Sequence, residues 1–247
     1  MDNGVFLAQR LHRKSIFLDG YSVDRQPVWV VPGNEKGGGI MTYIENVFIC
    51  MLSPLLIAAF CMGKKQLRLF PFCIAGMGAC LFSAYINTFF AAVYQSDALV
   101  AAVEIAPVTE EVMKLLPLLF YLLVFEPEPA RIKNAAITIA VSFATFENIC
   151  YLTQNGAGHF SLIFFRGFGT GAMHVICGVI VGAGLAYAWQ RAWLKAAGIC
   201  GLLGAAITFH AIYNLLIVYG GTAQYIAYIL PVLLMAVGKA VFGTKRL

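Results

Sequence analysis

The chain has 247 residues, of which 60% are hydrophobic and only 12% are charged, and its formal net charge is +5. Soluble domains carry about twice that charged fraction, so the sequence lacks the polar residues that a soluble fold needs at its surface, and we expect a membrane protein. The basic residues lie in short segments between apolar runs, and this pattern excludes a nucleic-acid-binding patch.

The first 40 residues differ from the rest of the chain. They are polar and mixed in charge, and they end in three consecutive glycines, residues 37–39. Met41 directly follows this stretch and can itself serve as an initiator. We therefore interpret residues 1–40 as an appended or disordered tail, and residues 41–247 as one transmembrane domain.

Apolar runs follow the tail along the rest of the chain. A membrane-spanning helix needs about 20 mostly apolar residues. Seven runs meet this requirement: 43–62, 69–93, 98–125, 134–153, 163–189, 197–219 and 223–240. Pro107 and Pro117 in the third run predict a kink or a break there. The predicted fold is therefore all-α, a polytopic transmembrane bundle of seven to eight helices.

Basic residues mark every second linker between these runs. The linkers near Gln95, Asn155 and Gly220 are almost free of Lys and Arg. Because basic linkers stay on the cytoplasmic side, the first helix starts outside and the C-terminus lies inside, in a multi-pass protein of the cell (plasma) membrane. The basic linkers hold Lys64, Lys65 and Arg68; Arg131 and Lys133; Arg191 and Lys195; and Lys239, Lys245 and Arg246.

Ionisable residues occur inside the third run. Each one costs roughly 2.5 to 3.5 kcal/mol at the bilayer centre, so each needs a partner or a function. Lys114 follows Glu110 by four residues and Glu111 by three, so it can pair with either carboxylate on one helix face. A structural ion pair explains one carboxylate and leaves the other available as a general base.

Further polar residues lie in other runs. His210 and Asn214 are one helical turn apart, and together they can orient water and stabilise an oxyanion. Counted from the outer helix ends at about 1.5 Å per residue, Glu110 is roughly 18 Å deep, His174 and His210 roughly 14 to 16 Å, and Glu147 roughly 9 Å. We therefore expect a shared aqueous cavity in the outer half of the membrane.

These residues form four ordered motifs, at 106–114, 143–148, 166–178 and 210–214. In this order the motifs resemble the PrsW family of intramembrane proteases, which belongs with the CAAX prenyl endopeptidases and bacteriocin-processing proteins. The resemblance implies regulated proteolysis of single-pass membrane proteins, such as anti-sigma factors. It also implies a core of functional residues: Glu110, Glu111, Glu147, His174 and His210.

Two mechanisms for peptide-bond hydrolysis remain open. In the first, Glu110 or Glu111, assisted by a histidine, takes a proton from water, while Lys114 holds the second carboxylate and Asn214 and His210 stabilise the oxyanion. This mechanism needs no cofactor. In the second, a divalent metal such as zinc is bound, and its candidate ligands are Glu111, Glu147, His174 and His210.

Two other classes of function compete with hydrolysis. Buried Glu and His chains also occur in proton-coupled transporters, but the sequence shows no internal repeat of the kind that transporters carry. A non-catalytic membrane scaffold is the other alternative. The expected partners are the lipid bilayer and a single-pass transmembrane substrate, without nucleic acid.

Overall fold

The computed structural model describes Phe48, residues 66–155 and residues 160–243, and every regular element in these residues is a helix. The predicted all-α class is therefore confirmed for them. The expected tail (1–40) and first spanning helix (43–62) lie outside the described residues. The elements are η2 (Gln66–Leu69), α3 (Phe70–Val93), α4 (Ala98–Val100), η3 (Ala101–Ile105), α5 (Ala106–Phe125), α6 (Pro129–Asn155), α7 (Phe160–Ala188), η4 (Ala192–Leu194), α8 (Lys195–Tyr219) and α9 (Gly221–Gly243).

By length and composition, four helices in the described residues can cross a membrane. The predicted count of seven to eight is therefore not supported. The helix α5 falls short because it carries Glu110, Glu111 and Lys114, and the apolar part of α9, Gly221–Val237, is shorter. The four spans are Phe70–Val93, Pro129–Gln154, Phe164–Ala188 and Ala192–Tyr219.

The third predicted run is helical throughout, without the predicted break. Its helix type changes instead: α4 leads into η3, a π-helical turn, and η3 leads into α5. Pro107 lies at the junction of η3 and α5, where it removes one backbone hydrogen bond from the continuous helix, while Pro117 lies inside α5. Because π-turns often occur at functional sites, the turn before Glu110 marks this stretch as a candidate site.

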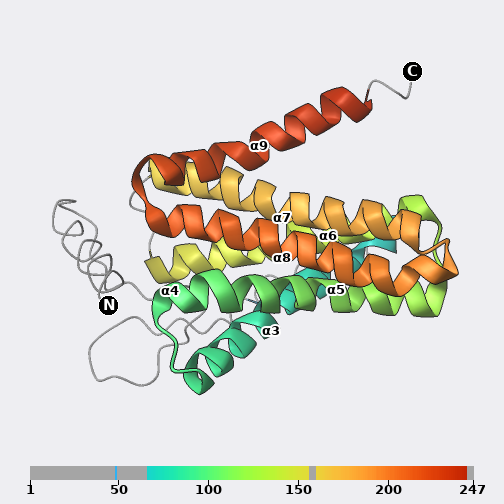
Figure 1. The fold of residues 1–247 in the computed structure, drawn as a ribbon, viewed down its shortest axis with the longest axis horizontal. Helices are drawn as coiled ribbons and strands as arrows, with labels where there is room; N and C mark the ends of the chain where they lie inside the picture. The colour runs from blue at the N-terminus through green and yellow to red at the C-terminus, as the bar shows by residue number, and fades with distance from the viewer. Residues whose placement is uncertain (1–47, 49–65, 156–159, 244–247) are drawn as a thin grey trace, which may run out of the picture.

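The helices α5, α6, α7 and α8 run side by side along the long axis of the molecule (Figure 1). The helix α3 packs on α5 and α6, so α6 lies between α3 and α7. The helix α9 packs on α7 and α8 and then diverges from them toward the C-terminus (Figure 1). The centre of the bundle is therefore enclosed by α5, α6, α7 and α8.

Small residues bring α6 and α7 close together. A Cβ atom added at Gly178 would lie 2.7 Å from the Cβ of Ala140, and one added at Gly182 would lie 2.6 Å from the Cβ of Ala136. These two glycines therefore let the helices approach closely, as their spacing predicts. The similar pair Gly167 and Gly171 has open space beside it among the described residues.

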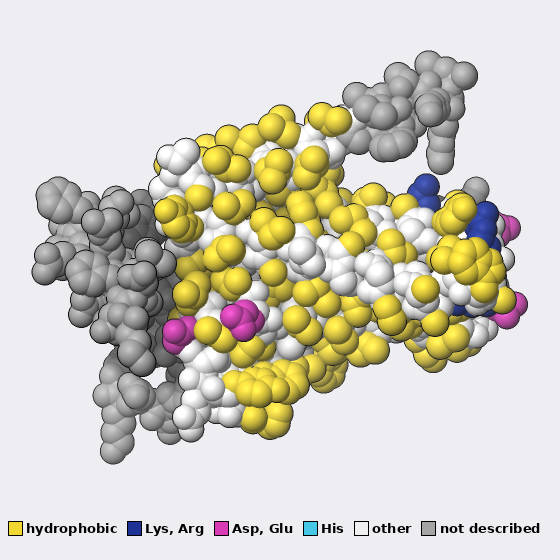
Figure 2. All heavy atoms as spheres, viewed as in Figure 1, with side chains coloured by type: hydrophobic (Ala, Val, Ile, Leu, Met, Phe, Trp, Pro, Cys, Tyr) yellow, Lys and Arg dark blue, Asp and Glu magenta, His cyan; other side chains and the backbone are white. Residues whose placement is uncertain are grey.

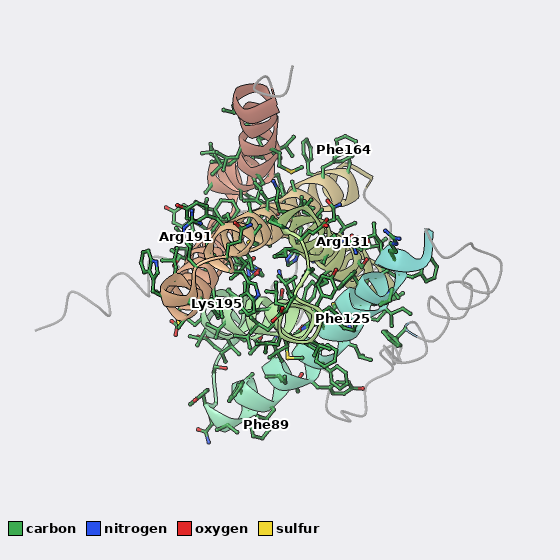
Figure 3. The ribbon with its side chains drawn as sticks, turned by 90° about the vertical axis from the view of Figure 1, so that its right-hand side faces the viewer. Phe89, Phe125, Arg131, Phe164, Arg191 and Lys195 are labelled. Atoms are coloured by element: carbon green, nitrogen blue, oxygen red, sulfur yellow. The ribbon has the colours of Figure 1, made fainter. Side chains whose placement is uncertain are left out.

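Hydrophobic side chains cover the face of the bundle shown in Figure 2, and the visible basic side chains gather at its right-hand end. Viewed from that end, Arg131 lies on the α3 side of the bundle and Arg191 and Lys195 lie on the opposite side (Figure 3). The basic linkers between α5 and α6 and between α7 and α8 therefore meet at one end of the molecule.

Candidate active site

The predicted site residues, apart from Asn214, converge in the middle of the bundle. They come from four helices, and each is at most 7% exposed. Ionisable side chains at such burial require partners or a bound ion. The converging residues are Glu110, Glu111 and Lys114 of α5, Glu147 of α6, His174 of α7 and His210 of α8.

Glu111 is the carboxylate that pairs with Lys114. The Lys114 Nζ lies 2.6 Å from the Glu111 Oε1 and 2.9 Å from the His174 Nδ1. The same carboxylate oxygen lies 2.9 Å from the His210 Nδ1. Because a carboxylate accepts hydrogen bonds, the His210 Nδ1 donates, and Glu111 thereby fixes the orientation of that imidazole.

Glu147 holds the second histidine. Its Oε2 lies 2.6 Å from the His174 Nε2, and its Oε1 accepts from the Arg166 Nη2 at 3.0 Å. Lysine donates only, so the His174 Nδ1 accepts from Lys114 and the Nε2 of the neutral ring carries the hydrogen. The Arg166 guanidinium also stacks 3.8 Å from the centre of the Tyr151 ring, which anchors this ion pair at one side of the site.

Glu110 has a different environment from these two carboxylates. Both of its oxygens are buried without a hydrogen-bond partner among the described residues. The His210 Nε2 lies 3.8 Å from the Glu110 Oε2, beyond hydrogen-bonding distance. Because the His210 Nδ1 carries the hydrogen, the Nε2 of the neutral ring presents a lone pair toward a carboxylate oxygen. Two facing acceptors of this kind need a proton, a water molecule or a cation between them.

The balance of charges in the site also indicates that Glu110 needs a proton or a cation. Glu111 pairs with Lys114, and Glu147 pairs with Arg166, so two carboxylates are matched by two cations. Glu110 has no third cation beside it in the described part of the chain. An uncompensated buried carboxylate is costly, so Glu110 either holds a proton or binds a positive ion.

A metal ion fits Glu110 and the His210 Nε2, whereas the His174 Nδ1 would have to exchange its hydrogen bond from Lys114 for the metal. Ligand atoms of Glu110, His174 and His210 lie within 4.8 Å of one another, and two His with one Glu is a common ligand set for catalytic zinc. This set differs from the predicted ligands, which included Glu111 and Glu147. Glu111 and Glu147 instead form hydrogen bonds with the two histidines. At zinc sites, carboxylates that do not touch the metal often orient the ligand histidines in this way.

Asn214 lies outside this cluster of partners. Its Nδ2 donates to the carbonyl oxygen of Ala102 at 2.9 Å, so its amide ties α8 to the π-turn η3. Because Pro107 has no backbone N–H to donate to the Ala102 carbonyl five residues earlier, this bond satisfies that carbonyl. An oxyanion role for Asn214 stays a prediction.

Several polar contacts around the site were not predicted from the sequence. Arg166 was noted as a motif residue but not as the partner of Glu147. Thr170 and Tyr213 share a buried hydrogen bond of 2.9 Å between α7 and α8, and Thr109 bonds to Asn87 between α5 and α3. Arg166 was detectable because an arginine at membrane depth requires a carboxylate, whereas hydroxyl pairs give no such signal.

Comparison with known proteins gives one match. The family model described as PrsW family intramembrane metalloprotease matches residues 64–238, which is well over half of the chain. The matched region includes every helix of the site. No curated protein and no solved structure matches the chain.

Proposed function

The chain belongs to the PrsW family of intramembrane proteases, and from this premise we propose that it cleaves single-pass membrane proteins with a water molecule activated at Glu110. Family membership makes it a protease and a multi-pass membrane protein. The substrate class, with anti-sigma factors as candidates, follows from the resemblance of the motifs.

The state of Glu110 is the observation that supports this mechanism best. It is fully buried, lacks a hydrogen-bond partner among the described residues and faces the His210 Nε2. A purely structural carboxylate would be paired, as Glu111 and Glu147 are. Glu110 is therefore the group that is free to hold or deprotonate a nucleophilic water.

We favour the metal-dependent form of the reaction. Glu110, His210 and His174, with the His174 Nδ1 released from Lys114, would hold the ion, and a divalent cation such as zinc would supply the positive charge that activates water and polarises the scissile carbonyl. The cation also provides the counter-charge that Glu110 lacks. In the metal-free alternative, Glu110 takes the proton from a water that it shares with the His210 Nε2.

The other charged residues act as supports in both forms. Glu111 holds His210 through its Nδ1, and Glu147 holds His174 through its Nε2. In the metal-free form, Lys114 contacts both Glu111 and His174 and so fixes the distance between the two halves of the site; in the metal-dependent form it would keep only its contact with Glu111. Burial of the cluster excludes bulk water, which strengthens these electrostatic contacts.

The same proposal includes a topology. The basic end, with Arg131, Arg191 and Lys195, would lie on the cytoplasmic side, so that the C-terminus is inside and the first helix starts outside. The helices α5 and α9 would complete the membrane domain beside the four apolar spans. The site would then lie in the outer half of the plasma membrane.

The test is cleavage of a candidate single-pass substrate by the reconstituted protein. Glu110→Gln keeps the shape of the side chain and removes its charge, and it should lower the cleavage rate by about 10³-fold, because general acid–base groups contribute about 10² to 10⁴. Glu104→Gln is the matched control, since Glu104 is an exposed carboxylate on the neighbouring π-turn. Wild-type rates in Glu110→Gln, or equal losses in both variants, would refute the assignment.

A further inference from the structure

A groove separate from the active site lies between α3, α5 and α6. Its volume is about 690 Å³, in the range of sites for small ligands. Arg68, Arg131 and Asn134 line it together with apolar side chains of α3 and α5. Its lining thus combines cationic and apolar groups.

The apolar wall is built mainly of aromatic rings. Phe72 of α3 meets Tyr121 of α5 edge to face, with ring centres 4.8 Å apart, and Tyr121 contacts Phe125 one turn later. Phe120 and Phe125 are 62% and 63% exposed, so this wall is open on the outer surface of the bundle. A surface of this kind binds hydrocarbon chains in a bilayer.

The cationic groups lie at the basic end of the groove. Arg68 has no ion-pair partner among the described residues, and Arg131 lies 3.8 Å from the exposed carboxylate of Glu128. At the same end, Arg191 is occupied by the ring and carbonyl of Tyr187, and Lys195 lies over the Trp189 ring. Arg68 is therefore available to an external anion, and the partner of Arg131 is an exposed carboxylate at a long distance.

The groove occupies a distinct level of the membrane. It extends along α5 from Phe125 to Pro117, about 12 Å at 1.5 Å per residue, and Glu110 lies about 10 Å further along the same helix. Arg131 and Phe125 lie close together at the basic end, on the α3 side of the bundle (Figure 3). In the proposed topology, the charged end would face the interface and the apolar end would face the bilayer interior.

We propose that this groove binds one anionic phospholipid of the leaflet at the basic end. The phosphate would bind Arg68 and Arg131, since guanidinium groups match phosphate oxygens well, and an acyl chain would lie along Phe72, Phe120 and Pro117. Basic pockets between membrane helices bind lipid headgroups in this way. A phospholipid fits better than a soluble anion because the groove is mostly apolar.

Titration of lipid into the delipidated full chain in detergent, followed by native mass spectrometry, tests this proposal. The probes are dioleoyl-phosphatidylglycerol, which is anionic, and dioleoyl-phosphatidylcholine, which has the same acyl chains and no net charge. The wild type should retain phosphatidylglycerol selectively. Arg68→Gln with Arg131→Gln should weaken this binding about tenfold or more, at roughly 1 kcal/mol for each basic residue.

Three further variants distinguish binding in the groove from general attraction of an anionic lipid to the basic end. Ala75→Leu fills the apolar part and should also weaken binding, whereas Arg68→Lys with Arg131→Lys keeps the charge and should retain most of it. Arg191→Gln with Lys195→Gln removes the same charge from the other side of this end and should leave binding unchanged.

Several results would overturn the proposal. They are equal binding of both lipids by the wild type, equal losses in the groove and control variants, and absence of any retained lipid. The last result would indicate that another part of the chain or a partner protein fills the groove. Substrate cleavage by each variant, which depends on the separate Glu110 site, checks that the variants are folded.

Discussion

The two halves of α5 differ in what surrounds them, although they form one continuous helix. In the first half, up to Leu115, Glu110, Glu111 and Lys114 are buried against α6, α7 and α8. In the second half, large hydrophobic side chains such as Leu123 point outward, with 69% of that side chain exposed. Charges are therefore stable at membrane depth where partners surround them: α5 itself supplies the Glu111–Lys114 pair, and α7 and α8 supply the histidines that contact it.

Removing one partner from the polar half should have the largest effect on stability. Glu111→Gln leaves Lys114 without its carboxylate at 2.6 Å and weakens the hold on His210. The free energy of unfolding should fall by about 3 to 5 kcal/mol, because a buried charge loses its counter-ion. Thermal unfolding in detergent micelles measures this loss.

The neighbouring carboxylate is the control for that experiment. Glu110→Gln breaks no hydrogen bond among the described residues, so its thermal stability should match the wild type although its activity is lost. Equal destabilisation by both substitutions would show that the two carboxylates have equivalent environments. It would contradict the contrast between a paired Glu111 and a Glu110 without a hydrogen-bond partner among the described residues.

An intermediate effect on stability is expected at the close contact between α6 and α7, the two helices that carry Glu147 and His174. Gly178→Ala places a methyl group 2.7 Å from the Cβ of Ala140, one turn after His174, so the helices must separate. Overpacking of this kind costs about 1 to 3 kcal/mol, and displacement of His174 from Glu147 should lower cleavage as well.

Gly171→Ala on the same helix provides the comparison for Gly178→Ala. Open space lies beside Gly171 among the described residues, so alanine should be neutral or slightly stabilising there. Unfolding temperatures of the two variants measured side by side test the close approach of α6 and α7. Equal temperatures would contradict it.

The smallest effect is expected in the apolar half of α5. Leu123→Ala removes a side chain that makes few contacts within the protein, so the free energy of unfolding should change by less than about 0.5 kcal/mol. A loss as large as that of Glu111→Gln, measured in the same unfolding assay, would mean that this face is packed against another protein surface.

Much of the helical framework is predictable from the sequence because apolar run length sets where a membrane helix begins and ends. The predicted run 69–93 agrees with α3, Phe70–Val93, and the run 197–219 agrees with α8, Lys195–Tyr219. In the third run, where the sequence predicts a kink or a break, the π-turn η3 precedes Pro107 and the chain stays helical on both sides of it.

The pairing inside the site is less predictable. Lys114 can reach Glu110 or Glu111 by helical spacing alone, and the positions of His174 and His210 on other helices decide that it contacts Glu111. The contact between Glu147 and His174, whose side chains lie 2.6 Å apart, is likewise not predicted by counting residues from the helix ends. Such contacts depend on how helices pack, which periodicity does not encode.

The metal content of the purified protein, measured together with its cleavage activity, tests the role of Glu110 most directly. We expect about one divalent ion per chain in the wild type and in Glu104→Gln, and strongly reduced metal in Glu110→Gln. Chelation should abolish cleavage, and added zinc should restore it. Full cleavage by metal-free wild type would contradict the metal-dependent form. Full cleavage by Glu110→Gln would contradict the central role of this carboxylate.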